Sequence, residues 1–193
     1  MTTMSTPNSS SYLQNNFLIA MPNLLDPSFQ QSVTLICEHN EEGALGIVIN
    51  QPLEMKFVEI LDHLHIAYDR RRVPDVPVLY GGPVQPDRGF VIHSEAGDWK
   101  SSLRLNSSLY ITTSLDILEA LAAGNCDDRV FIVLGYAGWE AGQLEHEILQ
   151  NAWLNSPTDS TVVFDIPVEK RWRAAAKLLG VDLNQLSQEV GHS

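Results

Sequence analysis

The chain has 193 residues, of which 44% are hydrophobic, and this is enough to supply one ordinary globular core. Its 24 acidic and 12 basic residues give a formal net charge of −12. A surface of that sign repels phosphate backbones and anionic lipids, so nucleic-acid binding would require a local basic patch. No apolar run is long enough to span a membrane, and we expect no membrane insertion.

The N-terminal residues predict a disordered tail followed by one domain. Residues 1–12 are polar and uncharged, and they lack the basic and apolar regions of a signal peptide. We expect residues 13–193 to form a single domain, because no linker or internal repeat divides them. Cys37 is expected to be a buried small hydrophobe, while Cys126 precedes two aspartates that oppose a thiolate. This cysteine usage favours a reduced, cytoplasmic protein.

The first half of the chain predicts hairpins and one helix. We expect a short strand at 17–20 and paired strands at 33–37 and 45–50, because a charged, glycine-containing loop separates the pair. Residues 54–67 predict a helix. Its buried side carries four apolar residues, Phe57, Ile60, Leu61 and Leu64. The three arginines at 70–72 complement the negative end of that helix or are solvated, and the alternative is a nucleic-acid contact, which usually needs a wider basic face.

The remaining elements predict a mixture of strands and helices. Further strands are expected at 78–80, 89–93, 103–105, 109–112 and 161–164, and a helix at 114–123. Pro167 opens a helix that ends near Gly180, and Asp182 caps a last short helix. Hairpins early in the chain and alternation later favour a mixed α+β sheet over a purely parallel, doubly wound one.

Val130–Trp153 is the most informative stretch. We predict a buried strand at 130–134, a glycine-rich turn at 135–142 and an amphipathic helix after it. Leu144, Ile148 and Ala152 recur every four residues and mark the buried side of that helix. The glycines either permit only a sharp turn and close packing, or they expose amides that hold an anion.

The histidines do not form a recognisable metal-binding or catalytic pattern. His146 and Glu147 begin a zinc-protease pattern, but Gln150 stands where the second histidine ligand is required. His93 and Ser94 are neighbours on an expected strand, so their side chains point to opposite faces. No partner that would activate His93 is visible in the sequence. The sequence therefore predicts no catalytic residue, no metal site and no cofactor.

Two groups of basic residues have alternative interpretations. Lys170, Arg173 and Lys177 fall on one face of the last long helix, where they either contact phosphates or form a solvated face. Arg88 lies beside glycines between two expected strands. Its guanidinium either clamps a carboxylate or phosphate, or pairs with a nearby acid such as Asp87.

Taken together, several motifs resemble the YqgE/AlgH family of bacterial proteins. They follow the family's order over most of the chain: FLIAMP (17–22), DPSF (26–29), GALGIVINQP (43–52), GGPV (81–84), RGFV (88–91), GYAGW (135–139) and GQLE (142–145). The resemblance implies an α+β fold in which a mixed, branched β-sheet forms a pseudo-barrel with flanking helices. It implies no catalytic residues, and one branch of the family is labelled a transcriptional regulator.

Two functional hypotheses follow. The first is a non-enzymatic regulatory or interaction protein that acts through an unknown protein partner, because the acidic charge disfavours direct DNA binding. The second is a protein or enzyme that binds a small anionic ligand between the turns Gly81–Arg88 and Gly138–Glu145. The candidate ligand-binding residues are Gly81, Gly82, Arg88, Gly138, Trp139 and Glu145.

Overall fold

A computed structural model describes residues 12–125 and 129–189, so residues 1–11 of the expected tail and Cys126 lie outside the described residues, while the Tyr12 ring packs against His39. The strands are β1 (Asn16–Ala20), β2 (Val33–Asn40), β3 (Gly43–Val48), β4 (Val78–Tyr80), β5 (Val84–His93), β6 (Ser102–Asn106), β7 (Leu109–Thr112), β8 (Val130–Glu140) and β9 (Trp153–Pro157). The helices are α1 (Phe57–His63), α2 (Leu115–Ala122), α3 (Gln143–Leu149), α4 (Ser160–Phe164), α5 (Arg171–Lys177) and α6 (Leu183–Glu189), with a 3-10 turn, η2, at Val168–Lys170. The expected α+β class is confirmed.

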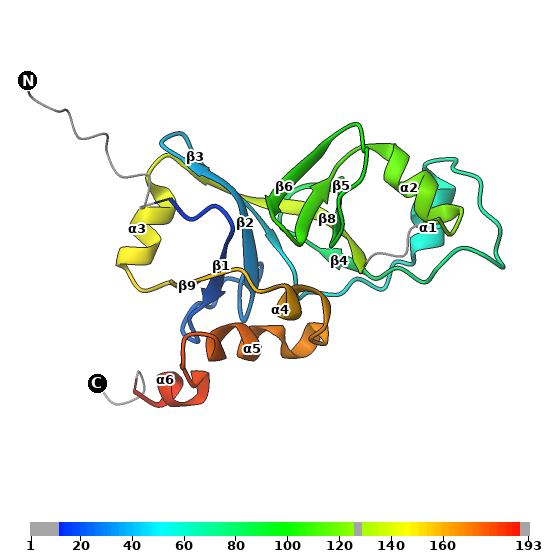
Figure 1. Cartoon of the computed structure of the whole chain (residues 1–193). Coiled ribbons are helices and arrows are strands. Elements are labelled where there is room, and N and C mark those ends of the chain that lie inside the picture. Colours follow the sequence, from blue (N-terminus) through cyan, green and yellow to red (C-terminus); the bar gives the residue numbers. More distant parts are fainter. Residues whose placement is uncertain (1–11, 126–128, 190–193) are drawn as a thin grey trace, which may run out of the picture.

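The nine strands form one branched sheet that curls into a half-barrel (Figure 1). Along its main path the strand order is β6-β7-β5-β8-β3-β2-β1-β9, and every pair on this path is antiparallel. Strand β4 lies off the path and pairs in parallel with β8. The sheet is therefore mixed and branched, as the family resemblance implied.

Strand β8 is the branch point, and its sequence changes character where the sheet divides. Phe131 and Val133 pack into one apolar cluster while Ile132 packs into another, so this half is buried on both faces. Beyond Gly135 the strand alternates, with Ala137 buried and Gly138 exposed. The first half pairs with β5 and β4, and the second half pairs with β3. Burial on two faces explains the continuous apolar run at the start of the strand.

The prediction of a glycine-rich turn at 135–142 is wrong, because β8 runs as one strand from Val130 to Glu140. Gly135 has φ of +81°, and a Cβ placed there would lie 2.4 Å from the carbonyl oxygen of Gly82. Glycine is needed here because the two backbones touch at the branch. The actual turn is confined to Ala141 and Gly142, and α3 then begins at Gln143.

Side chains close the gap between the two ends of the curled sheet. Asn106, at the end of β6, donates from Nδ2 to Asn15 Oδ1 at 3.0 Å and to Thr158 Oγ1 at 3.1 Å. The Thr158 hydroxyl also donates to Asn15 Oδ1 at 2.6 Å. These residues flank β1 and β9, the strands at the far end of the sheet order. Polar side chains thus join edges that have no backbone ladder between them.

The segment 153–164 differs from the prediction in both of its elements. Trp153–Pro157 is a strand that pairs with β1, whereas residues 161–164, expected as a strand, belong to α4. The Asp159 carboxylate accepts a hydrogen bond from the Val162 amide at 3.0 Å and caps α4. A capping aspartate and the burial of Val162 and Val163 outweigh the strand preference of β-branched residues.

Candidate functional site

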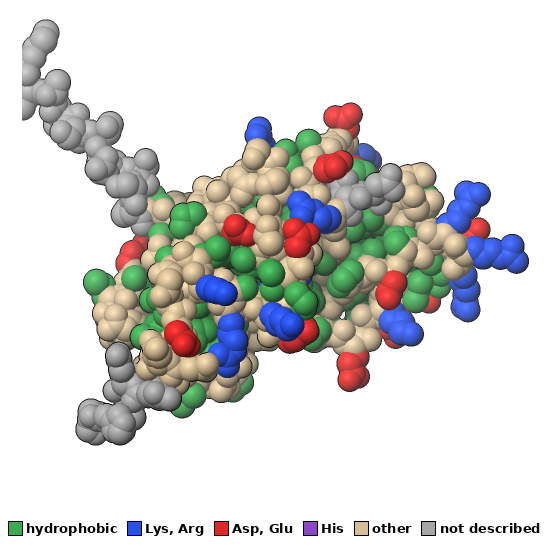
Figure 2. Space-filling model, turned by 60° about the horizontal axis from the view of Figure 1, so that its bottom comes forward, with side chains coloured by type: hydrophobic (Ala, Val, Ile, Leu, Met, Phe, Trp, Pro, Cys, Tyr) green, Lys and Arg blue, Asp and Glu red, His purple; other side chains and the backbone are tan. Residues whose placement is uncertain are grey.

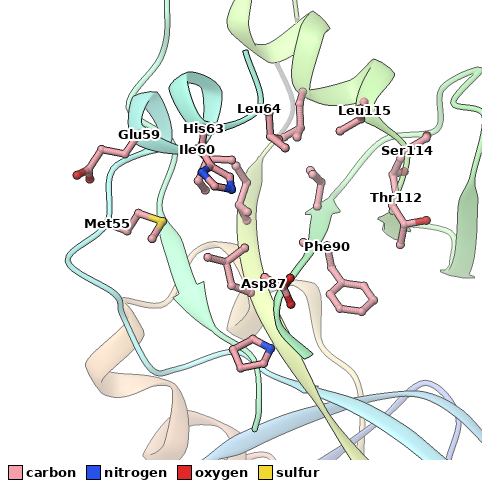
Figure 3. A pocket seen from close by; sticks show the side chains of 17 residues that line it. Met55, Glu59, Ile60, His63, Leu64, Asp87, Phe90, Thr112, Ser114 and Leu115 are labelled. Atoms are coloured by element: carbon pink, nitrogen blue, oxygen red, sulfur yellow. The ribbon is translucent and has the colours of Figure 1, made fainter. Parts of the chain in front are cut away.

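A cavity lies between α1 and α2, over the β5–β8 part of the sheet (Figure 3). Its volume is about 670 Å³, which falls in the size range of ligand-binding clefts. We call it the interhelical groove. The helices supply Ile60, Leu64, Leu115 and Leu118 to its walls, and the sheet supplies Phe90, Val91, Ile132 and Leu134 to its floor.

Local sequence signals fix the two helices that form the walls. The backbone amide of Lys56 donates to Glu59 Oε2 at 2.6 Å, so Glu59 caps the start of α1. Helix α1 buries Phe57 and Leu61 against the core, and α2 does the same with Ile117 and Leu121. Each helix thus has a firmly packed side, and the groove opens beside it.

The apolar surface of the groove continues outward to its mouth. Met55 is 44% exposed, Leu64 is 39% exposed and Leu115 is 53% exposed. We expected Leu64 on the buried side of its helix, and that prediction is wrong because α1 ends at His63 and Leu64 is its exposed C-cap residue. Contiguous exposed apolar residues around a hollow mark interaction sites more often than isolated ones do.

Few polar groups enter the groove, and those that do are acidic or neutral. Glu59, His63 and Asp87 are the titratable residues among those lining it, and the lining contains no lysine or arginine. Both His63 and Asp87 line the groove; in Figure 3, His63 lies on α1 near Ile60, and Asp87 lies on β5 near Phe90, below the two helices. Within the described part of the chain, the Asp87 carboxylate makes no hydrogen bond or ion pair. The groove therefore presents an unpaired carboxylate beside an apolar surface.

A buried polar network lies behind the groove wall at Thr112. His93 Nδ1 donates to the carbonyl of Glu95 at 2.8 Å, and Nε2 lies within hydrogen-bond distance, 2.7 Å, of Thr112 Oγ1. Thr112 Oγ1 in turn lies 3.0 Å from Ser102 Oγ. Burial lowers the pKa of His93, so the neutral imidazole is favoured. Because both His93 and Thr112 are fully buried, this network supports the wall.

The predicted residues Gly81 and Gly82 lie at the branch of the sheet. Both are buried, and the Gly81 amide donates to the Leu134 carbonyl at 2.8 Å. A Cβ at Gly82 would lie 2.2 Å from the backbone of Tyr136. Their architectural role is close backbone packing against β8.

Arg88 lies on the exposed part of β5, and its guanidinium stacks on aromatic rings. Its Cζ atom is 5.2 Å from the ring centroid of Phe90 and 5.6 Å from that of Tyr136. No ion pair joins Arg88 to Asp87 or to another residue of the described ranges. The interpretation of Arg88 as one half of a salt bridge is therefore wrong, and its charge stays accessible.

The predicted residues at the other end of β8 contact a different set of partners. Trp139 packs against Trp153 with ring centroids 6.2 Å apart, and its indole donates to Glu147 Oε1 at 3.4 Å. Glu145 Oε1 accepts from His39 Nε2 at 2.7 Å. Gly138 is exposed in the strand. Trp139 lines a shallow hollow of about 200 Å³, whereas Pro86 and Asp87 line the interhelical groove.

The basic residues of α5 are dispersed over their face of the molecule. Lys170, Arg173 and Lys177 are all exposed, and Arg173 Nη1 donates to Asn184 Oδ1 at 3.0 Å. Figure 2 shows Lys and Arg side chains on this side interspersed with hydrophobic and acidic ones. This arrangement fits a solvated face.

Sequence reasoning missed the groove, although one signal pointed toward it. Met55 and Leu115 are large apolar residues at the edges of their helices, outside the periodic positions that predict a core. Such residues are ordinary when scattered. Only the fold shows that Met55, Leu64 and Leu115 share one rim.

The fold defines an α+β protein with a branched half-barrel sheet. The AlgH-like family model matches residues 17–184, and the chain belongs to that family. It is 53% identical over 184 residues to a UPF0301 protein of Thioalkalivibrio sulfidiphilus, covering 95% of this chain and 98% of the relative. A UPF0301 protein of Nitrosococcus oceani is 50% identical over 182 residues, covering 94% of this chain and 97% of the relative.

Two solved structures share this architecture. The solution structure of the AlgH protein from Pseudomonas aeruginosa has 47% identity and a TM-score of 0.78, covering 98% of this chain and all of that one. A Corynebacterium diphtheriae protein has 19% identity and a TM-score of 0.70, over 95% of this chain and 94% of that one, and shows the fold alone. Within 12–125 and 129–189, no helix is long and apolar enough to cross a membrane.

Proposed function

We propose that the protein is a non-enzymatic regulatory protein that acts in the cytoplasm by binding a protein partner through the interhelical groove. The supporting observation is the apolar rim formed by Met55, Leu64 and Leu115 around an apolar hollow. Burying that rim against a partner removes apolar surface from water, which is the main driving force of association. The acidic charge of the chain disfavours direct DNA binding, so regulation through a protein contact agrees with it.

Site-specific photocrosslinking tests this function. With a benzoylphenylalanine at position 115 in living cells, we expect one discrete crosslinked partner. The matched control is position 149, since Leu149 is 82% exposed and lies on α3, away from the groove. The substitution Leu64→Glu in the same chain should abolish the crosslink from 115. A product that forms equally from 149, or that survives Leu64→Glu, contradicts the proposal.

A second candidate function is the binding of a small anion at Arg88. Its accessible guanidinium, stacked on Phe90 and Tyr136, supports this hypothesis. Of the six candidate residues, Arg88 is the one that offers a positive charge, while Glu145 is engaged by His39. We expect pyrophosphate or citrate to raise the melting temperature of the protein and not that of Arg88→Ala, with Arg173→Ala as the control. Equal shifts in all three proteins exclude this candidate.

A further inference from the structure

The helix layer over this face of the sheet has a gap. Helices α1 and α2 both pack against the β4–β8–β5 region, with Phe57, Leu61, Ile117 and Leu121 buried beneath them. Between them, Phe90, Val91, Ile132 and Leu134 line the floor of the groove. Phe90, Val91 and Ile132 are each 4% exposed or less, and Leu134 is half-buried. A helix laid over the groove would therefore cover mainly Leu134 and the exposed apolar residues at the rim.

The extent of the apolar surface favours a macromolecule over a small ligand. Ligand clefts enclose most of the bound molecule, so their recognition surface lies within the cavity. Here the apolar surface continues onto Met55, Leu64 and Leu115, which are exposed at the mouth. A helix that inserts apolar side chains into the hollow would also cover these three residues. Methionine at such a rim adapts its shape to different side chains.

The charges around the groove restrict the sequence of that helix. Asp87 lines the hollow, and its side chain has no ion-pair partner among the described residues. In Figure 3 the Glu59 side chain points away from the hollow, and its Oε2 accepts from the Lys56 amide. No lysine or arginine is among the residues that line the groove. An acidic residue on the incoming helix would be repelled by the Asp87 carboxylate, while a basic residue would meet a complementary charge.

We propose that the interhelical groove binds a short amphipathic helix of the partner protein, with a lysine or arginine beside its apolar face. This inference rests on the proposed function, since it names the part of the partner that docks. Recognition uses apolar anchors at i, i+3 or i+4, and i+7 that enter the hollow. The basic residue pairs with Asp87 at the rim.

Peptide binding with matched charges tests the inference. Two synthetic peptides of about four helical turns share the same leucine anchors and differ only in flanking lysines or glutamates. Fluorescence polarisation with the full-length protein should show about tenfold tighter binding of the lysine peptide at low salt. The ratio should shrink in high salt because rim charges are screened. Asp87→Lys should reverse the preference, since Asp87 is exposed and its replacement leaves the core intact.

The controls make each outcome decisive. Glu41→Lys makes the same charge change in the turn between β2 and β3, away from the groove, and should leave the preference unchanged. Equal affinity for the two peptides overturns the basic-helix inference, as does a preference that Asp87→Lys does not alter. Self-association of the chain that is abolished by Leu115→Glu would instead assign the groove to a second copy. Absence of the cellular crosslink from position 115 would contradict the proposed function, whereas the peptide affinities test the basic-helix inference.

Discussion

The helices on the α5 side cover the sheet more completely than the helices on the α1–α2 side. On the α5 side, Trp172 donates from its indole to the Ala20 carbonyl at 2.8 Å, and Arg171 donates to the Ile49 carbonyl at 2.6 Å. Ala175 and Ala176 are fully buried there. On the α1–α2 side, the helices leave a hollow of about 670 Å³ with an exposed rim. A closed layer stabilises the fold, whereas an open layer keeps apolar surface available for binding.

The largest expected effect is at Arg171, in the closed layer. Its guanidinium donates to the carbonyls of Ile49 and Ile166 and lies over Phe131, with 5.2 Å to the ring centroid. Burial lowers its pKa to about 10, so it remains charged at neutral pH. Arg171→Ala should lower the free energy of unfolding by about 4 kcal/mol, because it leaves buried carbonyls unpaired. Urea denaturation measures this, and the exposed Arg173→Ala should cost less than about 0.5 kcal/mol.

The next effect concerns the branch that both layers share. Gly135→Ala should cost about 3 kcal/mol, because the added methyl group meets the Gly82 carbonyl at a positive φ. Gly138→Ala is the matched control on the same strand, since a Cβ there meets nothing within 4 Å. It should change stability by less than about 1 kcal/mol. Similar losses in both variants would show that the branch does not depend on close contact at Gly135.

A smaller effect is expected at His93, behind the wall of the open layer. Its pKa in the folded protein is lowered from the ordinary 6.5 by burial. The unfolded state therefore binds the proton more readily, so stability is complete above pH 6.5 and declines as the pH falls below it. This single group contributes a slope of at most about 1.4 kcal/mol per pH unit. Between pH 6.5 and pH 5, the unfolding free energy of His93→Gln should therefore fall less steeply with decreasing pH than that of the unmodified protein. Parallel curves for the two proteins would contradict this prediction.

The smallest effect is expected at the rim of the groove. Leu115→Glu should change the free energy of unfolding by less than about 0.5 kcal/mol, because its side chain is already exposed. Leu121→Ala, on the packed side of the same helix, should cost about 3 kcal/mol. A large loss at Leu115 would show that the rim belongs to the core, and the contrast between the two layers would fail.

The sequence by itself determined most of the elements and the family. Alternating and continuous apolar runs predict β1, β2, β3 and β4, and helical spacing predicts α1 and α3, because these patterns report burial directly. Capping and stop residues predict α2. Errors arose where local signals compete. The glycines of β8 resemble a turn, yet they permit one strand to pass close to Gly82.

Only the tertiary structure decided where the candidate site lies. Leu64, Asp87 and Leu115 come from distant parts of the chain, and no periodic pattern links them. Likewise, Arg88 and Asp87 are neighbours in sequence, but Arg88 lies over Phe90 and Tyr136 while Asp87 faces the groove. Patterns in a sequence record which side chains are buried. A gap between two helices depends on how far apart the sheet holds them, and that distance is set by the packing of the whole fold.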